Sequence, residues 1–134
     1  MTHLRCAKCG HVLTRSCRWG APDEHDPEAT DRALAIAVGV MVRLQDIDVR
    51  AATPNVEAIK TKMHPVAGAV SINPSDLLPD RLRPDGPDSG CCGSAGLDGP
   101  NRACAACGAV VATEWGDCWT QAEIRFAPGA VEAG

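Results

Sequence analysis

Large aromatic side chains are nearly absent from this sequence. Of its 134 residues none is Tyr, one is Phe (Phe126) and three are Trp. Because aromatic residues normally supply much of the buried area of a protein core, smaller apolar residues must fill this one. The chain also has 13 Gly, 10 Pro and 8 Cys, a composition that favours loops. We therefore expect metal ions or disulfides to hold part of the fold.

Long hydrophobic segments are missing as well. Residues 1–6 contain no apolar run that could act as a secretion signal, and the longest apolar run, residues 33–42, has ten residues. Ten residues are too few to cross a bilayer. We expect a cytoplasmic protein without membrane contact. In that reducing compartment, cysteine clusters serve as metal ligands more often than as disulfides.

The short motifs of several common catalytic sites do not occur in the sequence. It has no His-Glu-x-x-His, no Gly-x-x-x-x-Gly-Lys-Ser/Thr, no Gly-x-Ser-x-Gly and no Gly-x-Gly-x-x-Gly. An enzyme is therefore less expected than a binding module. The net charge of −4 argues against an obligatory nucleic-acid partner. A basic group without acidic neighbours keeps nucleic acid as an alternative to a protein partner: Arg5, Lys8, Arg15 and Arg18.

Two copies of one cysteine motif are the strongest signal that the sequence does contain. A Cys-x-x-Cys-Gly motif begins at Cys6 and again at Cys104. Two intervening residues let both thiolates reach one ion, and the glycine tolerates the positive φ of a tight turn. Zn²⁺ prefers a tetrahedron of ligands, which two such pairs supply. The predicted ligands of one shared Zn²⁺ are Cys6, Cys9, Cys104 and Cys107.

The paired motifs resemble the zinc-ribbon group, whose members fold two rubredoxin-like knuckles around one zinc ion. The resemblance implies two hairpins, one from each motif, and a closed structural metal site. It covers the two motifs and the β-prone residues after them. The 94 residues between Cys9 and Cys104 are a much longer insert than a simple ribbon carries.

Three other cysteines leave alternatives open. A local site could combine one residue of the adjacent pair with the second motif: Cys91 or Cys92 with Cys104, Cys107 and Cys118. The first motif would then need other partners: Cys17 with His3, His11 or His25. A third arrangement has two sites, the second formed by Cys91, Cys92 and Cys118 with Cys17 or His64. Side chains of adjacent cysteines tend to diverge, so one of the pair could be a ligand and the other a buried thiol.

The segment from Gly90 to Trp119 resembles the tail of small bacterial Cys-rich proteins. The resemblance rests on Cys-Cys-Gly, on Leu-Asp-Gly-Pro-Asn ending at Asn101, and on Asp-Cys-Trp ending at Trp119. That group has no established activity that could be transferred. The local chemistry still predicts that Asn101 bonds backbone groups near the second motif.

We predict a single α+β domain: a zinc-stapled β-ribbon or antiparallel sheet with an inserted helical segment. Residues 1–20 form the first knuckle, 26–64 the helical insert, 66–127 a strand and loop zone with the second knuckle, and 128–134 a frayed tail. The helix is expected from Asp26, a good N-cap followed by Pro, to about Leu44. A second helix is expected over residues 56–63. Strands are expected over 69–72, 109–113 and 123–126.

The preferred function is a structural zinc-binding protein, a non-catalytic interaction module. A four-sulfur site has no open position at which zinc could activate water. The alternative is a thiol–disulfide redox protein that uses Cys91–Cys92 or one Cys-x-x-Cys pair, because such pairs can carry reactive thiolates. Redox Cys-x-x-Cys motifs usually begin a helix, whereas β-prone residues follow both motifs here.

Overall fold

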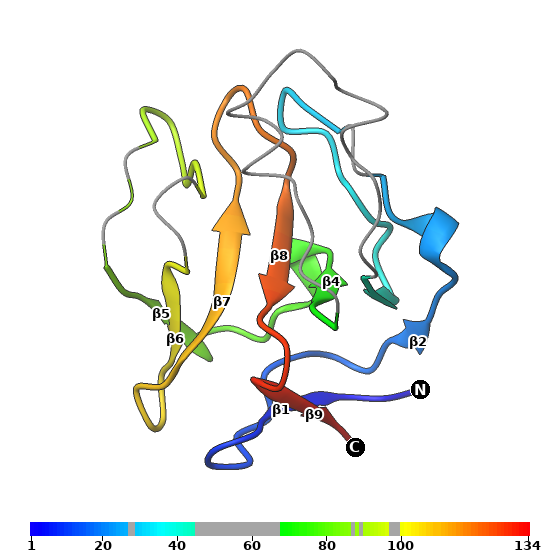
Figure 1. The fold of residues 1–134 in the computed structure, drawn as a ribbon, viewed down its shortest axis with the longest axis vertical. Helices are drawn as coiled ribbons and strands as arrows, with labels where there is room; N and C mark the ends of the chain where they lie inside the picture. The colour runs from blue at the N-terminus through cyan, green and yellow to red at the C-terminus, as the bar shows by residue number, and fades with distance from the viewer. Residues whose placement is uncertain (27–28, 45–67, 87, 89, 97–99) are drawn as a thin grey trace.

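The computed structural model describes residues 1–26, 29–44, 68–86, 88, 90–96 and 100–134. These residues form a largely antiparallel β structure of two sheets (Figure 1). The strands are β1 (Leu4–Cys6), β2 (Arg18–Trp19), β3 (Val40–Arg43), β4 (Val70–Ile72), β5 (Leu82–Pro84), β6 (Arg102–Cys104), β7 (Val110–Trp115), β8 (Glu123–Phe126) and β9 (Val131–Ala133).

The larger sheet has the order β2-β3-β4-β8-β7-β6-β5, and the smaller sheet pairs β1 with β9. All neighbours are antiparallel except β2 and β3. The central strand, β8, aligns Ile124 with Ile72 on one side and with Glu114 on the other. Figure 1 shows β1 and β9 together at one end of the larger sheet, close to both chain termini.

The central strands of the larger sheet are buried on both faces. Alternate residues of β8, Ile124 and Phe126, join the main apolar core with residues of the small sheet such as Leu4. The other two, Glu123 and Arg125, are buried as well. Side chains in a strand point to opposite faces in turn, so one face of β8 carries the apolar core and the other carries buried charges.

The α+β prediction is wrong, because the described residues contain no α-helix. Their helical elements are two 3-10 turns, η1 (Pro22–Glu24) and η2 (Pro74–Asp76). The helix expected from Asp26 is interrupted by positive φ at Asp31 and Arg32, which a right-handed helix does not allow.

The apolar residues that recur at helical spacing within this range belong instead to a loop and a strand. Leu34 and Val38 are 56 % and 61 % exposed, so they do not form a buried stripe. Gly39 has φ +85°, and β3 begins directly after it. β-branched residues such as Val40 and Val42 pack well in a strand, and these two lie in a second apolar cluster on the opposite face from Met41.

The strands expected in the second half of the chain are confirmed. β4, β7 and β8 lie within one or two residues of the predicted ranges. Residues 131–133, expected to belong to a loose tail, instead form β9 and pair with β1. The second helix, expected over 56–63, lies outside the described residues, as does most of the expected insert.

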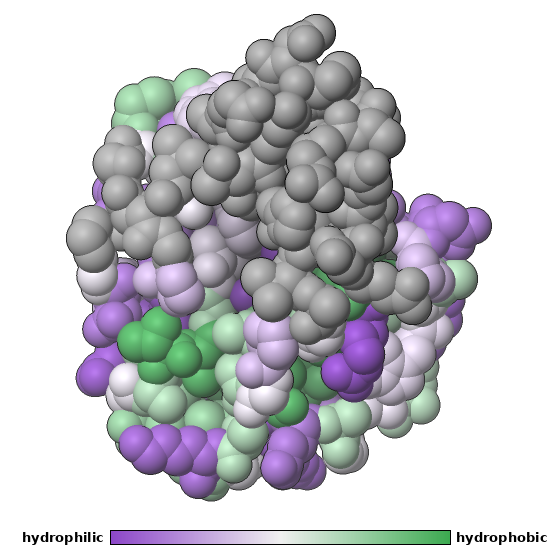
Figure 2. Space-filling model, in the orientation of Figure 1, coloured by the Kyte–Doolittle hydropathy of each residue, from purple (hydrophilic) through white to green (hydrophobic). Residues whose placement is uncertain are grey.

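No membrane-crossing helix occurs in the described ranges, where each helical element has three residues. In the space-filling view of Figure 2, the described surface mixes hydrophilic and hydrophobic side chains, with a hydrophobic area over the region of β6 and β7. The larger exposed apolar side chains are Met1, Trp19, Leu34, Val38 and Val110.

Candidate metal centres

The two Cys-x-x-Cys-Gly motifs meet in space. Cys6 ends β1 and Cys104 ends β6, and each is followed by a tight turn that carries the second cysteine of its motif. The first motif therefore extends from the small sheet and the second from the large sheet. The Sγ atoms of four cysteines all lie within 4.8 Å of one another: Cys6, Cys9, Cys104 and Cys107. We call this group the four-cysteine cluster.

The sulfur spacing of this cluster matches a tetrahedral thiolate site. The Sγ atoms of Cys6 and Cys107 are 3.7 Å apart, and those of Cys9 and Cys104 are also 3.7 Å apart. A tetrahedron with metal–sulfur bonds of about 2.3 Å has edges of about 3.8 Å. Both short distances join different motifs, so an ion at the centre would connect the two knuckles. Such an ion has no place left for a fifth protein ligand or for substrate.

The two knuckles have the same backbone geometry. Gly10 donates its N–H to the Cys6 carbonyl, and Gly108 donates to the Cys104 carbonyl, both at 2.8 Å. Their φ angles are +79° and +80°. This left-handed conformation, which glycine adopts without steric strain, lets the chain turn back into a short β bridge or strand after each motif.

Backbone N–H groups of the knuckles act on the thiols. The N–H of Ala109 lowers the pKa of Cys107 to about 7, against the opposing effect of lost hydration. The N–H of His11 lowers the pKa of Cys9 in the same way, but lost hydration and the neighbouring thiols raise it to about 12 overall. Cys107 therefore loses its proton more readily than Cys9. A bound cation requires the thiolate form of its cysteine ligands.

A segment from Asp76 to Pro84 connects the two knuckles from the side. The Leu78 N–H donates to Leu13 of the first hairpin, and the Ala105 N–H of the second knuckle donates to the Arg81 carbonyl. Arg81 also donates from its guanidinium to the Val12 carbonyl at 2.8 Å. These contacts link the two knuckles through the residues between them.

Replacing either turn glycine by alanine is expected to lower stability by about 1–2 kcal/mol, the penalty of placing a Cβ in the left-handed region. At Gly10 a Cβ meets nothing within 4 Å, and at Gly108 it meets the Arg83 guanidinium, a flexible group. Gly116→Ala is the matched control, because Gly116 has open space and no positive φ. Urea unfolding of the three variants tests this; equal stability of Gly10→Ala and Gly116→Ala would contradict it.

A second group lies at the other end of β7. Three of its four residues are exposed thiols, and the fourth is a buried carboxylate: Cys91, Cys92, Cys118 and Asp117. The Sγ of Cys91 lies 3.0 Å from that of Cys92 and 3.7 Å from that of Cys118. The Cys92 thiol raises the pKa of Cys91, and the Cys91 thiol raises the pKa of Cys118. We call the three thiols the three-cysteine cluster.

Asp117 organises this second group. Its Oδ1 accepts hydrogen bonds from the backbone N–H groups of Cys92 at 2.9 Å and Cys118 at 2.8 Å. Its Oδ2 accepts from the Trp119 indole N–H at 3.0 Å. Burial raises the pKa of this carboxyl, but the hydrogen bonds together lower it by more, so the pKa lies below its ordinary value. Asp117 is thus an ionised anchor that fixes both cysteine-bearing segments.

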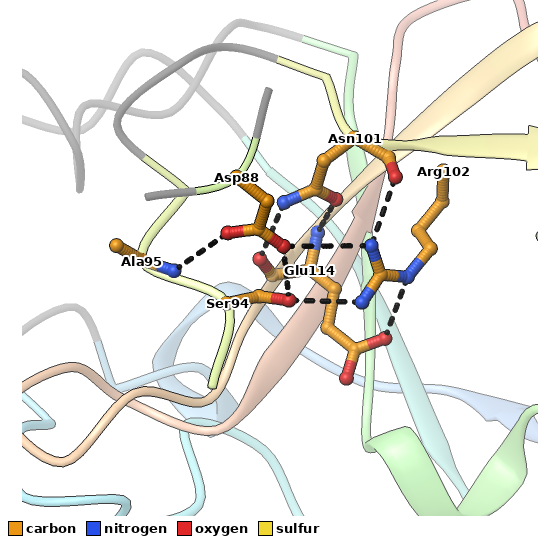
Figure 3. A network of polar contacts seen from close by, with 6 residues as sticks. All are labelled: Asp88, Ser94, Ala95, Asn101, Arg102 and Glu114. Atoms are coloured by element: carbon orange, nitrogen blue, oxygen red, sulfur yellow. Dashed lines mark hydrogen bonds and ion pairs between the residues drawn. The ribbon is translucent and has the colours of Figure 1, made fainter. Parts of the chain in front are cut away.

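The chain before β6 is fastened to β7 by a polar network around Arg102 (Figure 3). Arg102 donates to Ser94 Oγ at 2.8 Å and to a carboxylate oxygen of Glu114 at 3.3 Å. The Asn101 side chain both donates to the Glu114 carbonyl and accepts from its N–H. Asn101 therefore bonds backbone groups as predicted, but those of β7 at the end away from the second motif. The Ser94 carbonyl then accepts from Gly116 and Asp117. This network holds residues 91–95 beside the turn that carries Cys118.

Among the described residues, the other cysteine and histidine residues considered as metal ligands do not join either group. Cys17 is buried outside both groups; its pKa rises to about 11 because of burial and the nearby Asp76. His3 bonds Thr14 and Ser16 through its two ring nitrogens, and His25 bonds Glu123. His64 lies outside the described residues. The arrangement that joined Cys91 or Cys92 to the second motif is not formed, because the second motif meets the first.

Sequence reasoning missed one residue of the second group and one buried polar pair at the larger sheet. Asp117 was not proposed, although an Asp directly before a Cys at a turn can accept local backbone N–H groups. The buried pair of His25 and Glu123, joined at 2.7 Å, comes from residues 98 positions apart and has no local signature.

Comparisons of this chain with protein-family models, with curated proteins and with solved structures find no match.

Proposed function

We propose that this is a structural zinc-binding protein whose four-cysteine cluster holds one Zn²⁺ and joins the two β-sheets. The observation that carries the proposal is the pair of 3.7 Å sulfur distances, each of which links one motif to the other. A tetrahedral four-thiolate set suits Zn²⁺ or a single iron ion. Zinc is the choice here because its role in a closed site is structural, and nothing in the two knuckles demands a redox metal.

A non-catalytic role follows from the closed coordination. Four protein sulfurs fill the tetrahedron, so zinc there has no open position for a water molecule or a substrate. The ion would instead contribute directly to folding, because the two halves of the site come from opposite ends of the chain. All eight cysteines are free thiols in the structure, which suits a reducing compartment such as the cytoplasm.

The proposed role of the folded unit is to present its surface to a protein partner. Leu34 and Val38 are exposed by more than half, and the fully buried centre of a protein interface is more apolar than its rim. Nucleic acid is a weaker candidate. Arg18 pairs with Glu24, and the exposed Trp19 ring already has the Arg43 guanidinium 5.0 Å from its centre, which reduces its availability to stack on a base.

The redox alternative rests on the three-cysteine cluster alone. Neither Cys-x-x-Cys motif precedes a helix, and the cysteines of both motifs belong to the four-cysteine cluster. Cys91 and Cys92 remain as an exposed pair with sulfurs 3.0 Å apart. Their oxidation would require an external acceptor of two electrons.

Native mass spectrometry of protein purified without added metal tests the zinc proposal. One bound zinc per chain is expected, with four thiols slow to react with an alkylating agent and the others faster. The four protected residues, located by peptide mapping, should be Cys6, Cys9, Cys104 and Cys107. Bound iron, with its visible absorbance, would contradict the choice of zinc. Metal-free folded protein with a Cys91–Cys92 disulfide would favour the redox alternative.

A further inference from the structure

The three-cysteine cluster differs from the four-cysteine cluster in accessibility. Cys91, Cys92 and Cys118 are all exposed, whereas in the four-cysteine cluster only Cys9 is exposed and both Cys6 and Cys104 are buried in the core. We propose that these three thiols form an exchangeable copper(I) site, separate from the structural ion. The proposal does not depend on the identity of the metal in the four-cysteine cluster.

The three sulfurs are the only ligands that we assign to this site, because both oxygens of the neighbouring Asp117 carboxylate already accept hydrogen bonds. Oδ1 of Asp117 accepts two backbone N–H groups and lies 3.5 Å from the Cys91 sulfur, and Oδ2 accepts the Trp119 indole N–H. A metal bond from either oxygen would have to displace one of these donors. Asp117 is therefore a positioning residue, which orients the cysteines without binding the ion.

Three thiolates match copper(I) better than zinc. Thiolate ligands suit both copper(I) and zinc, so the number of ligands decides, and copper(I) is satisfied by two or three sulfurs. A structural zinc site takes four protein ligands. In the part of the chain that the structure describes, the one other donor within reach of the three sulfurs is the Asp117 carboxylate, whose oxygens already accept backbone and indole N–H groups. The Cys91 sulfur lies near both others, at 3.0 and 3.7 Å, so small side-chain rotations bring all three to one ion.

The exposed side of the cluster gives the site its exchange chemistry. A thiolate of a donor or acceptor molecule can approach the ion from solvent, bind it as an additional ligand, and leave with it or without it. Binding replaces thiol protons by the ion and releases those protons to solvent. No electron is transferred, so the step needs no oxidant or reductant.

The two cysteine-bearing segments are held together before any ion arrives. The Ser94 carbonyl accepts hydrogen bonds from Gly116 and Asp117, and the Arg32 guanidinium donates to the Cys92 carbonyl at 3.1 Å. A site whose backbone is already fixed loses little conformational entropy when it binds. The ion would then reinforce an existing contact, which is consistent with loading and release without unfolding.

The test is an anaerobic competition titration of the full-length, metal-loaded protein with copper(I) in the presence of a chromogenic copper(I) chelator. One copper(I) per chain is expected to bind, and native mass spectrometry should show the resident metal still in place. Zinc added in the same range should not compete. Displacement of the resident metal by copper, or equal competition by zinc, would overturn the proposal.

Variants locate the ion and separate ligands from the positioning residue. Cys91→Ser and Cys118→Ser should abolish the stoichiometric copper(I), whereas Cys17→Ser, which removes a thiol outside both clusters, should leave it unchanged. Asp117→Asn keeps an oxygen acceptor, and it should weaken binding only about tenfold, as loss of a supporting contact does. Melting temperatures near that of the wild type show that the exposed serine variants fold. If Asp117→Asn removed copper as completely as Cys118→Ser, the three-sulfur assignment would be wrong.

Discussion

Cys104→Ser is expected to leave most of the protein unfolded at room temperature. Structural zinc contributes about 10–16 kcal/mol in small zinc-dependent units, which is comparable with the whole stability of a domain, about 5–15 kcal/mol. Cys104 is 0 % exposed and belongs both to the four-cysteine cluster and to the main core. Circular dichroism during thermal melting, with the metal content measured on the same sample, is the direct assay.

Two controls separate metal loss from damage to the core. Cys17→Ser changes a cysteine that is equally buried in the same core but is no ligand candidate in either cluster, so it should retain the metal and most of the melting temperature. A strong chelator should bring the wild type toward the behaviour of Cys104→Ser, and zinc should reverse that effect. A Cys104→Ser protein that melts like the wild type would refute the structural role of the ion.

Glu123→Met is expected to destabilise the fold by about 3–5 kcal/mol, because it removes a buried carboxylate to which the Arg125 guanidinium and other side chains are bonded. Oε2 of Glu123 accepts from Arg125 at 2.8 Å, from His25 at 2.7 Å and from Ser71 at 2.6 Å. The Glu123 side chain is 0 % exposed and that of Arg125 is 6 % exposed. Urea unfolding at neutral pH measures the loss, and methionine keeps the volume so that a cavity is not the cause.

The double variant Glu123→Met/Arg125→Met distinguishes the charge from the position. Replacement of both members of a buried pair by apolar residues is often much less harmful than removal of one. We therefore expect the double variant to be more stable than Glu123→Met alone. Equal or greater damage in the double variant would show that the hydrogen bonds of the individual residues, and not the guanidinium charge that remains in Glu123→Met, determine the loss.

The same glutamate makes part of the stability depend on pH. Burial raises the pKa of Glu123, but the Arg125 charge and the His25 hydrogen bond lower it well below the ordinary value. A lowered pKa in the folded state contributes stability above the unfolded pKa of about 4.3, and the contribution is lost as pH falls toward the folded value. The stability difference between wild type and Glu123→Met should therefore be full at pH 7 and shrink below about pH 4.

The parts of the structure that were predictable from the sequence have local causes. The Cys-x-x-Cys-Gly spacing, with glycine at the position of positive φ, indicated both knuckles. Alternating β-prone residues indicated β4, β7 and β8. Asn73 before a proline is also a local turn signal, and at η2 its side chain accepts the Ser75 N–H.

The errors arose where tertiary contacts decide the outcome. The spacing of Leu34, Val38 and Met41 fits a helix, but parallel pairing with β2 places Met41 in a strand and leaves the other two exposed. Polar and apolar residues alternate in β8, which ordinarily indicates one solvated face. Instead Glu123 finds its partners on segments remote in sequence, such as His25, and no single stretch of sequence shows that pairing.

The pairing of distant cysteines also bears on how the protein is made. Cys9 precedes Cys104 by 94 intervening residues, and a ribosome needs about 5–20 s to add that number at about 5–20 residues per second. Throughout that interval β1 has no β9 to pair with, and its two knuckle thiols have only half of their binding site. Completion of the four-cysteine cluster must therefore follow synthesis of the second knuckle. Until then Cys6 and Cys9 are open to thiol-reactive compounds from which a completed, metal-loaded cluster would protect them.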